Sequence, residues 1–238
     1  VINTAAYNFV DKVEESNIYP LAHKINALGP QFLAEATKSI HAKFVHFSTD
    51  YVFAGDKPGG YIEEDMPNPI SAYGKTKAEG ERLILEAGGY NYICRLSKIF
   101  GKPGISDVSK ESFAHLMLRL AREKSELSIV DEEVGCPSYT EDIAASVRRM
   151  LQLDMIPGIY HIVNEGKGVT WYEFAKEIFD IAKVEVETLP VLSDQFPKPA
   201  KRPKFAALKN TKLQPLRDRR DALFTFLIRE GLTNFKAK

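Results

Sequence analysis

The chain of 238 residues lacks the features that several protein classes require. Its two cysteines, Cys94 and Cys136, suit a reducing cytoplasm better than a disulfide scaffold, although pairing between them stays open. No apolar run approaches the ~20 residues of a membrane span, and the N-terminus has no secretory signal pattern. The 32 basic and 32 acidic residues cancel, so no overall field favours nucleic acid or an anionic membrane. We therefore expect a cytoplasmic globular protein that binds neither.

Metal, acyl-transfer and phosphate-loop signatures are also missing. The five histidines show no paired ligand spacing, so no metal site is predicted. A Gly-x-Ser-x-Gly elbow is absent. None of the 15 glycines forms a Gly-rich turn of the kind that cradles a pyrophosphate. Gly166-Lys-Gly168 comes nearest, but its third glycine would be position 171, which is Trp, so we interpret it as a chance likeness.

The first half of the chain alternates short β-prone runs with longer segments of helical period. Lys43–Ser48 and Tyr92–Leu96 are predicted strands, whereas Pro30–Ile40 and Ala72–Glu86 carry apolar or small residues three and four apart. This βαβα order predicts an α/β fold, a Rossmann-like doubly wound parallel sheet with helices on both faces. Ligands of such sheets bind at the carboxyl ends of the strands, where Ser48-Thr-Asp50 lies.

The second half continues the alternation and then changes in texture. The predicted elements are a helix over Phe113–Lys124, a strand over Leu127–Val130, a helix over Tyr139–Leu153 and a strand over Gly158–Val163. Thr140 is the expected N-cap of the third element, and Thr170 with Glu173 forms a capping-box pattern before another helix. The prolines at 190, 197, 199 and 203 predict a loop, and a last helix is expected over about Asp218–Arg229.

The strongest chemical signal is Tyr73-Gly-Lys-Thr-Lys77, which follows Thr49 by 24 residues (73 − 49). Tyr73 and Lys77 lie one helical turn apart on the same face, where a cation would favour phenolate and bring the phenol pKa closer to neutral. Tyr73 could then donate a proton to a carbonyl oxygen that Thr49 orients, while a nicotinamide supplies hydride. A Tyr-x-x-x-Lys pattern also arises by chance on exposed helices, but the preceding strand favours the functional reading.

Several runs along the chain resemble one enzyme family. They include Asn3-Thr-Ala-Ala-Tyr7, His46-Phe-Ser-Thr-Asp-Tyr-Val-Phe-Ala-Gly55, Asn68-Pro-Ile-Ser-Ala-Tyr-Gly-Lys-Thr-Lys77, Gly135-Cys-Pro-Ser-Tyr-Thr140 and Arg202-Pro203. In this order they are similar to the dTDP-4-dehydrorhamnose reductase family of the extended short-chain dehydrogenase/reductase superfamily. The resemblance implies reduction of the 4-keto group of a dTDP-deoxyhexose by NADPH or NADH, as in dTDP-rhamnose synthesis. A homodimer is left open.

The resemblance also assigns roles to residues and segments. It implies that the catalytic residues are Thr49, Tyr73 and Lys77; that the cofactor contacts Ala5, Ala6, Tyr7, Phe47, Tyr73 and Lys77; and that the sugar nucleotide faces Val10, Asp50, Lys98 and Arg202. Residues 1–100 would form a partial NAD(P)-binding domain to which 135–164 returns. Residues 101–134 and 165–238 would form a smaller α/β substrate-binding region.

Two departures from the family pattern leave alternatives open. Lys98 stands where the family usually has a Trp that packs against the substrate, and an ammonium is no indole platform, so the sugar stays undetermined. The chain also starts at what would be the fourth strand of the sheet, without the Gly-rich strand and turn that open the family's fold. Truncation, loss of cofactor binding and completion by a partner would each explain this, and truncation is our preferred expectation. The rival function is a non-catalytic regulatory subunit similar to the β subunit of methionine adenosyltransferase.

The basic cluster Lys198, Lys201, Arg202 and Lys204 also admits two readings. It could meet the substrate diphosphate, since Arg offers a bidentate fork to phosphate, or it could be a solvated loop. Arg202 is the better candidate of the four for a substrate contact because Arg202-Pro203 belongs to the resemblance.

Overall fold

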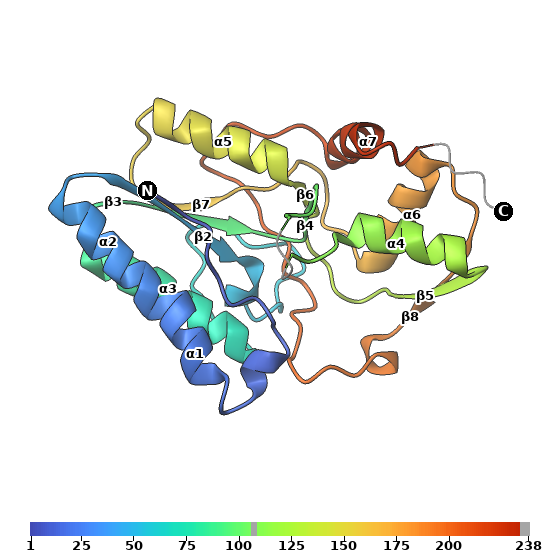
Figure 1. Ribbon diagram of the computed structural model, residues 1–238, viewed down its shortest axis with the longest axis horizontal. Coiled ribbons are helices and arrows are strands. Elements are labelled where there is room, and N and C mark those ends of the chain that lie inside the picture. The colour runs from blue at the N-terminus through green and yellow to red at the C-terminus, as the bar shows by residue number, and fades with distance from the viewer. Residues whose placement is uncertain (106–108, 234–238) are drawn as a thin grey trace.

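A four-stranded parallel sheet, with three strands from the first half of the chain and one from the second, organises the computed structural model, which describes residues 1–105 and 109–233 (Figure 1). Its strands, in spatial order, are β1 (Ile2–Asn3), β2 (Lys43–Thr49), β3 (Tyr90–Leu96) and β7 (Gly158–His161). Thr49 lies opposite Leu96 in the register, so β2 and β3 end at the same edge of the sheet. The predicted Rossmann-like parallel sheet is confirmed.

Helices cover both faces of this sheet because its strands carry apolar side chains on alternate sides. On one face lie α1 (Tyr19–His23), the π-helical turn η2 (Lys24–Leu28), α2 (Gly29–Ser39) and α3 (Ala72–Ala87), and on the other lies α5 (Thr140–Gln152) (Figure 1). Within β2, Phe44 packs with Ile84 of α3, whereas its neighbour Val45 packs with Ile143 of α5. The sheet is therefore covered by helices on both faces, as the βαβα order of the sequence predicts.

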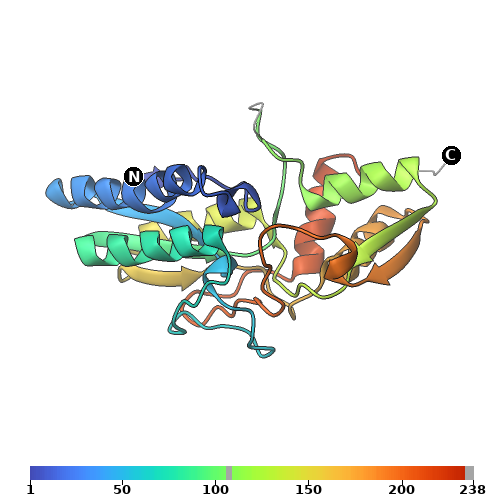
Figure 2. The same cartoon turned by 90° about the horizontal axis from the view of Figure 1, so that it is seen from below.

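A second, smaller region lies beside the sheet, and Figure 2 shows the two side by side. Its regular elements are β4 (Ile99–Phe100), α4 (Phe113–Glu123), β5 (Glu126–Val130), β6 (Ser138–Tyr139), α6 (Trp171–Ala182), β8 (Glu187–Val191) and α7 (Arg219–Arg229). β5 pairs with β8 and β4 with β6, each in parallel. The helices pack over the β5 and β8 pair through an apolar core that includes Phe100, Phe174 and Phe226. Three 3-10 turns complete the described elements: η1 (Lys12–Glu14), η3 (Asp50–Val52) and η4 (Ser193–Gln195).

The helix starts predicted at Thr170 and at Thr140 have different outcomes. The Thr170 side chain accepts from the Glu173 backbone N–H, and Glu173 accepts from the Thr170 N–H, so the predicted capping box is confirmed. The expected N-cap at Thr140 is wrong: Tyr139 is the N-cap and Thr140 is the first residue of α5. Tyr139 ends β6 and donates its N–H to Asn164, so pairing with β4 fixes the start of this helix.

The loop predicted around Pro190 is also wrong, because Pro190 lies within β8. Glu187 donates its N–H to the Ser125 carbonyl, and Val191 accepts from Asp131. Alternate residues of a parallel strand bond to the same neighbour, so residues 187, 189 and 191 face β5 and the nitrogen of Pro190 faces away. A proline is tolerated there because the missing N–H would have had no ladder partner.

Two further features bear on the expected class of protein. Across residues 1–105 and 109–233, no helix is both long and apolar enough to cross a membrane. Cys94 and Cys136 are both buried as free thiols.

Candidate active site

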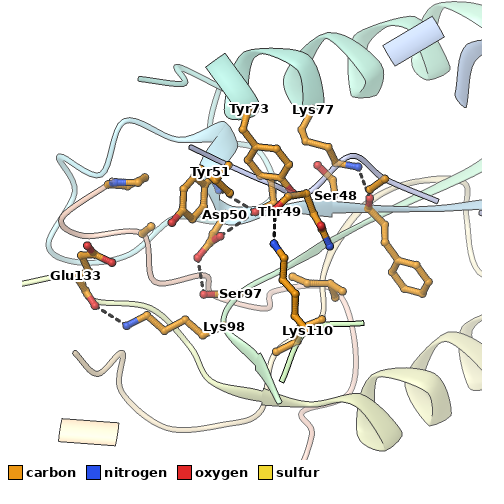
Figure 3. A pocket seen from close by; sticks show the side chains of 18 of the residues that line it. Ser48, Thr49, Asp50, Tyr51, Tyr73, Lys77, Ser97, Lys98, Lys110 and Glu133 are labelled. Carbon is orange, nitrogen blue, oxygen red and sulfur yellow. Dashed lines mark hydrogen bonds between the residues drawn. The ribbon is translucent and has the colours of Figure 1, made fainter. Parts of the chain in front are cut away.

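A cavity of about 350 Å³ opens where β2 and β3 end, between the sheet and the smaller region (Figure 3). The residues that line it include Thr4, Ala6, Asn8, Val10, Phe47, Thr49, Asp50, Tyr51, Tyr73, Lys77, Ser97, Lys98, Lys110, Glu133 and Trp171. Most of the residues predicted to act on substrate or cofactor thus meet in one place. The carboxyl edge of a parallel sheet is where ligands of such folds bind.

The first turn of α3 places Tyr73 in this cavity. Ser71 is the N-cap and accepts from the Gly74 N–H, which fixes where the helix begins. A Cβ on Gly74 would lie 2.3 Å from the Tyr51 carbonyl oxygen, so only glycine lets the helix approach η3 this closely. The Tyr73 ring packs edge-on against Tyr51 at 5.7 Å and points toward Thr49.

The electrostatics of Tyr73 differ from the prediction. Burial raises its pKa, the Asp50 carboxylate raises it further, and a hydrogen bond with Thr49 opposes the shift. The expected lowering of the pKa by Lys77 is wrong, because the Lys77 amine is turned away. Its Nζ donates to the Phe47 carbonyl at 2.7 Å and lies 3.0 Å from His46 Nε2.

Asp50 fixes the side chains of Thr49 and Ser97, which line the cavity, by hydrogen bonds. Its Oδ1 accepts from the Thr49 hydroxyl at 3.0 Å, and its Oδ2 accepts from the Ser97 hydroxyl at 2.6 Å. Ser97 in turn accepts from the Cys136 N–H at 3.0 Å. Burial is the main cause of a raised Asp50 pKa, which these hydrogen bonds oppose. Asp50 lines the cavity as predicted, and it also links the ends of β2 and β3.

The extended segment after β1 presents alternate side chains to the cavity. Thr4, Ala6, Asn8 and Val10 line it, whereas the predicted contacts Ala5 and Tyr7 do not. Successive side chains of extended backbone point to opposite sides, which accounts for the difference. The Tyr7 peptide is held from behind by the buried side chain of Asn26, which accepts from its N–H at 2.8 Å and donates to its carbonyl at 3.0 Å.

Lys98 lines the cavity, but its ammonium is already hydrogen-bonded to other groups of the protein. Nζ donates to the carbonyls of Glu133 and Val169 and lies 4.1 Å from the centre of the Trp171 ring. Burial lowers its pKa to about 8, and nearby carboxylates, first that of Asp50, oppose the shift. Lys98 therefore ties the end of β3 to the smaller region. The aromatic surface at this position comes from Trp171 on α6.

Arg202 does not line this cavity. Its guanidinium is paired with Asp11, NH1 to Oδ1 at 2.7 Å and NH2 to Oδ2 at 2.8 Å. Lys204 pairs with Glu132 at 2.9 Å. The bidentate pair of Arg202 joins the Pro-rich segment to the start of the chain, a role that neither reading of the basic cluster included.

The lining residues that were missed from the sequence include Lys110, Glu133 and Trp171. Lys110 Nζ donates to the Asn8 carbonyl at 2.7 Å, and Trp171 Nε1 donates to Glu133 Oε2 at 2.9 Å. Only Trp171 carried a signal, as the single tryptophan of the chain. Within the described ranges, 1–105 and 109–233, no group of three or more His, Cys, Asp or Glu side chains could hold a metal ion.

Comparison with known proteins gives a consistent result. A family profile described as the RmlD substrate binding domain matches residues 1–230. A dTDP-4-dehydrorhamnose reductase of Aggregatibacter actinomycetemcomitans is 38% identical over 225 residues, covering 90% of this chain and 74% of that protein. A dTDP-4-dehydrorhamnose reductase of Bacillus anthracis, solved in complex with NADP, superposes with a TM-score of 0.88 at 35% identity, covering 96% of this chain and 79% of the other. A Clostridium acetobutylicum reductase of the same name also gives 0.88 at 37% identity, covering 97% and 80%.

Proposed function

The chain belongs to the family of RmlD substrate binding domains, and from this premise we propose that it reduces the 4-keto group of a dTDP-deoxyhexose with NADPH or NADH. The observation that carries the proposal is the meeting of Thr49 and Tyr73 at the carboxyl end of β2, in a cavity of about 350 Å³. The relatives named above are called reductases of this substrate, and the solved Bacillus anthracis relative holds NADP.

The residues present fit the nicotinamide end of such a cofactor. Ala6 leaves room beside the sheet edge, Phe47 offers an apolar wall, and Lys77 stands beside the Phe47 carbonyl. When bound, the nicotinamide supplies the hydride. The polar side chains of Thr4 and Asn8 lie along the same wall and can meet hydroxyl groups of a ribose.

Tyr73 is the proton donor in this proposal. Because burial raises its pKa, the phenol stays protonated at neutral pH and can donate to a carbonyl oxygen as that oxygen gains charge. Thr49, held by Asp50, orients the same oxygen. Burial of Tyr73 and Asp50 limits the access of water to the transfer and strengthens these hydrogen bonds.

The sugar lies on the Asp50 and Val10 side of the cavity, against the smaller region. Trp171 and Glu133 form the facing wall, and Lys110 lines the cavity beside Asn8, to whose carbonyl it donates. An aromatic face and a lysine suit a sugar ring and a phosphate respectively. Arg202 contacts substrate only if its pair with Asp11 opens.

The experiment measures turnover and binding separately. The protein is given dTDP-4-dehydrorhamnose and NADPH, loss of NADPH absorbance reports turnover, and thermal shift with the dTDP-sugar alone reports binding. Tyr73→Phe should lose turnover by roughly 100-fold or more, with a thermal shift close to that of the unmodified chain. Tyr90→Phe, at an exposed tyrosine remote from the cavity, is the matched control and should keep both. Full turnover in Tyr73→Phe would contradict the mechanism, and no shift with either ligand would favour the regulatory subunit instead.

A further inference from the structure

Behind the cavity, three buried polar side chains form a line from β1 to α3. Asn3 Nδ2 lies 3.0 Å from His46 Nδ1, and His46 Nε2 lies 3.0 Å from Lys77 Nζ. Asn3 is 8% exposed, His46 0% and Lys77 2%, so water does not compete for these contacts. In each of the two contacts, one of these side chains must therefore donate a hydrogen and the other must accept it.

The orientation of the Asn3 amide is fixed by its neighbour in the chain. Asn3 Oδ1 accepts from the Ala5 N–H at 3.0 Å, so the oxygen faces Ala5 and the NH₂ group faces His46. The opposite orientation would place two donors together at Ala5. Because Asn3 donates to His46, Nδ1 of the imidazole must be the unprotonated nitrogen.

The orientation of the Asn3 amide determines whether the Lys77 amine is neutral or protonated. A neutral imidazole that accepts at Nδ1 carries its proton on Nε2 and donates there. Lys77 Nζ faces that Nε2–H, and an ammonium has no lone pair with which to accept it. A neutral amine does, and it can still donate one of its protons to the Phe47 carbonyl.

We propose that Asn3 and His46 are positioning residues that control the proton of Lys77. With Asn3 donating to Nδ1, His46 donates from Nε2 to a neutral Lys77 amine. When one proton enters the line and Lys77 becomes an ammonium, His46 must accept at Nε2 and carry its own proton on Nδ1. Asn3 must then turn its amide and release the Ala5 N–H.

The surrounding groups agree with this assignment. Burial lowers the pKa of Lys77 to about 8. Burial, followed by the charge that Lys77 carries as an ammonium, holds the pKa of His46 well below its usual value, so His46 stays neutral in both states. The charged group that opposes this on Lys77 is Glu81, one turn further along α3. Glu81 is itself bound by Ser48 of β2 and Arg95 of β3, which reduces its pull on Lys77.

The consequence for the reaction rests on the proposed function. A Lys77 that changes charge between neutral and mildly basic pH can take up and return a proton at Nζ, as a fixed ammonium cannot. Since Ala5 lies in the segment whose neighbours Thr4 and Ala6 line the cavity, the charge of Lys77 is also linked to the shape of that wall.

The test is an NMR titration that needs no turnover. Nitrogen-15 shifts of His46 report which ring nitrogen holds the proton, and the shift of the Lys77 side chain, assigned with Lys77→Met, reports its charge. In the unmodified chain we expect the Nε2–H form at high pH and the Nδ1–H form once Lys77 is protonated, with both changes at the same pH. A single His46 tautomer throughout the titration of Lys77 would overturn the proposal, whether or not the chain is a reductase.

Two substitutions of Asn3 separate this control from a simple charge effect. Asn3→Ala removes the donor to Nδ1 without adding charge, and should raise the midpoint of the Lys77 titration by about one pH unit. Asn3→Asp keeps the shape, accepts from both Ala5 and His46, and should hold the Nδ1–H form at every pH. If only Asn3→Asp moves the Lys77 midpoint, the effect is Coulombic and the proposal fails.

Discussion

The interior of the sheet region and the interior of the smaller region are packed with different kinds of side chain. Under the sheet, Arg95 is fully buried and its guanidinium binds Glu81, at 3.0 Å from Nε and 2.7 Å from NH2, while NH1 faces His161 at 3.5 Å. The main core of the smaller region is built from rings and aliphatic chains. The ring centroid of Phe100 lies 5.6 Å from that of Phe174 and 5.6 Å from that of Phe226.

The difference bears on how the candidate site is positioned. A buried polar side chain has few arrangements that satisfy all its hydrogen bonds, so a network of them fixes the geometry around Thr49, Tyr73 and Lys77. An apolar core tolerates changes of side chain that keep its volume. The reacting groups stand on the sheet beside its buried polar network, and the smaller region contributes the facing wall of the cavity.

The largest expected effect comes from breaking the buried ion pair. Arg95→Met leaves the Glu81 carboxylate buried without its main partner and should lower the free energy of unfolding by about 3 to 5 kcal/mol. Adding Glu81→Leu to that variant should restore part of the loss, since a neutral pair needs no such partner. Urea unfolding of the single and double variants measures both.

A matched change in the smaller region sharpens the contrast. Leu223→Met replaces a fully buried residue of the apolar core with one of similar volume and should cost less than about 1.5 kcal/mol. Equal losses for Leu223→Met and Arg95→Met would mean that the two regions do not differ in the way described.

Lys98 lies where the sheet and the smaller region meet, and its burial there should make the stability of the chain depend on pH. Its pKa falls from its ordinary value of 10.5 to about 8 in the folded chain, so the unfolded chain binds more protons between these pH values and stability rises with pH across them. Lys98→Met removes this contribution. The unfolding free energy of the unmodified chain, measured relative to Lys98→Met, should therefore increase by ~2 to 3 kcal/mol from pH 7 to pH 10. A constant difference over that range would show that the ammonium is not held in a desolvated site.

Local signals predicted much of this molecule. The strand at 43–48, the helix from Ala72 and the capping box at Thr170 were expected from the sequence, and the structure has all three. Each depends on residues within a few positions of one another, where periodicity and capping chemistry act directly. Lys77 and Thr49 reach the same cavity for the further reason that α3 and the end of β2 meet at one sheet edge.

What the sequence did not reveal depends on long-range pairing. Asp11 meets Arg202 and Lys98 meets Val169 because the tertiary fold brings these segments together, and no local pattern marks either contact. The raised pKa of Tyr73 has the same origin, since burial is its main cause and the Lys77 amine that motif reasoning invoked is bound to the Phe47 carbonyl instead. The low strand propensity of proline indicated a loop at Pro190. The structure places Pro190 in β8, because its nitrogen faces away from the neighbouring strand β5.

A smaller effect on stability than that of Arg95→Met should come from Gly74, where helix α3 approaches η3, and it tests whether close packing there positions Tyr73. Gly74→Ala places a Cβ 2.3 Å from the Tyr51 carbonyl oxygen and must displace backbone, at a cost of about 1 to 3 kcal/mol. Because Tyr73 is the adjacent residue, turnover should fall by more than this loss of folded protein explains. Gly59→Ala is the control: nothing lies within 4 Å of its added Cβ, and stability should change by less than about 0.5 kcal/mol. If Gly74→Ala lost stability but kept full turnover per folded molecule, Tyr73 would not need this approach, and the polar network under the sheet would position it alone.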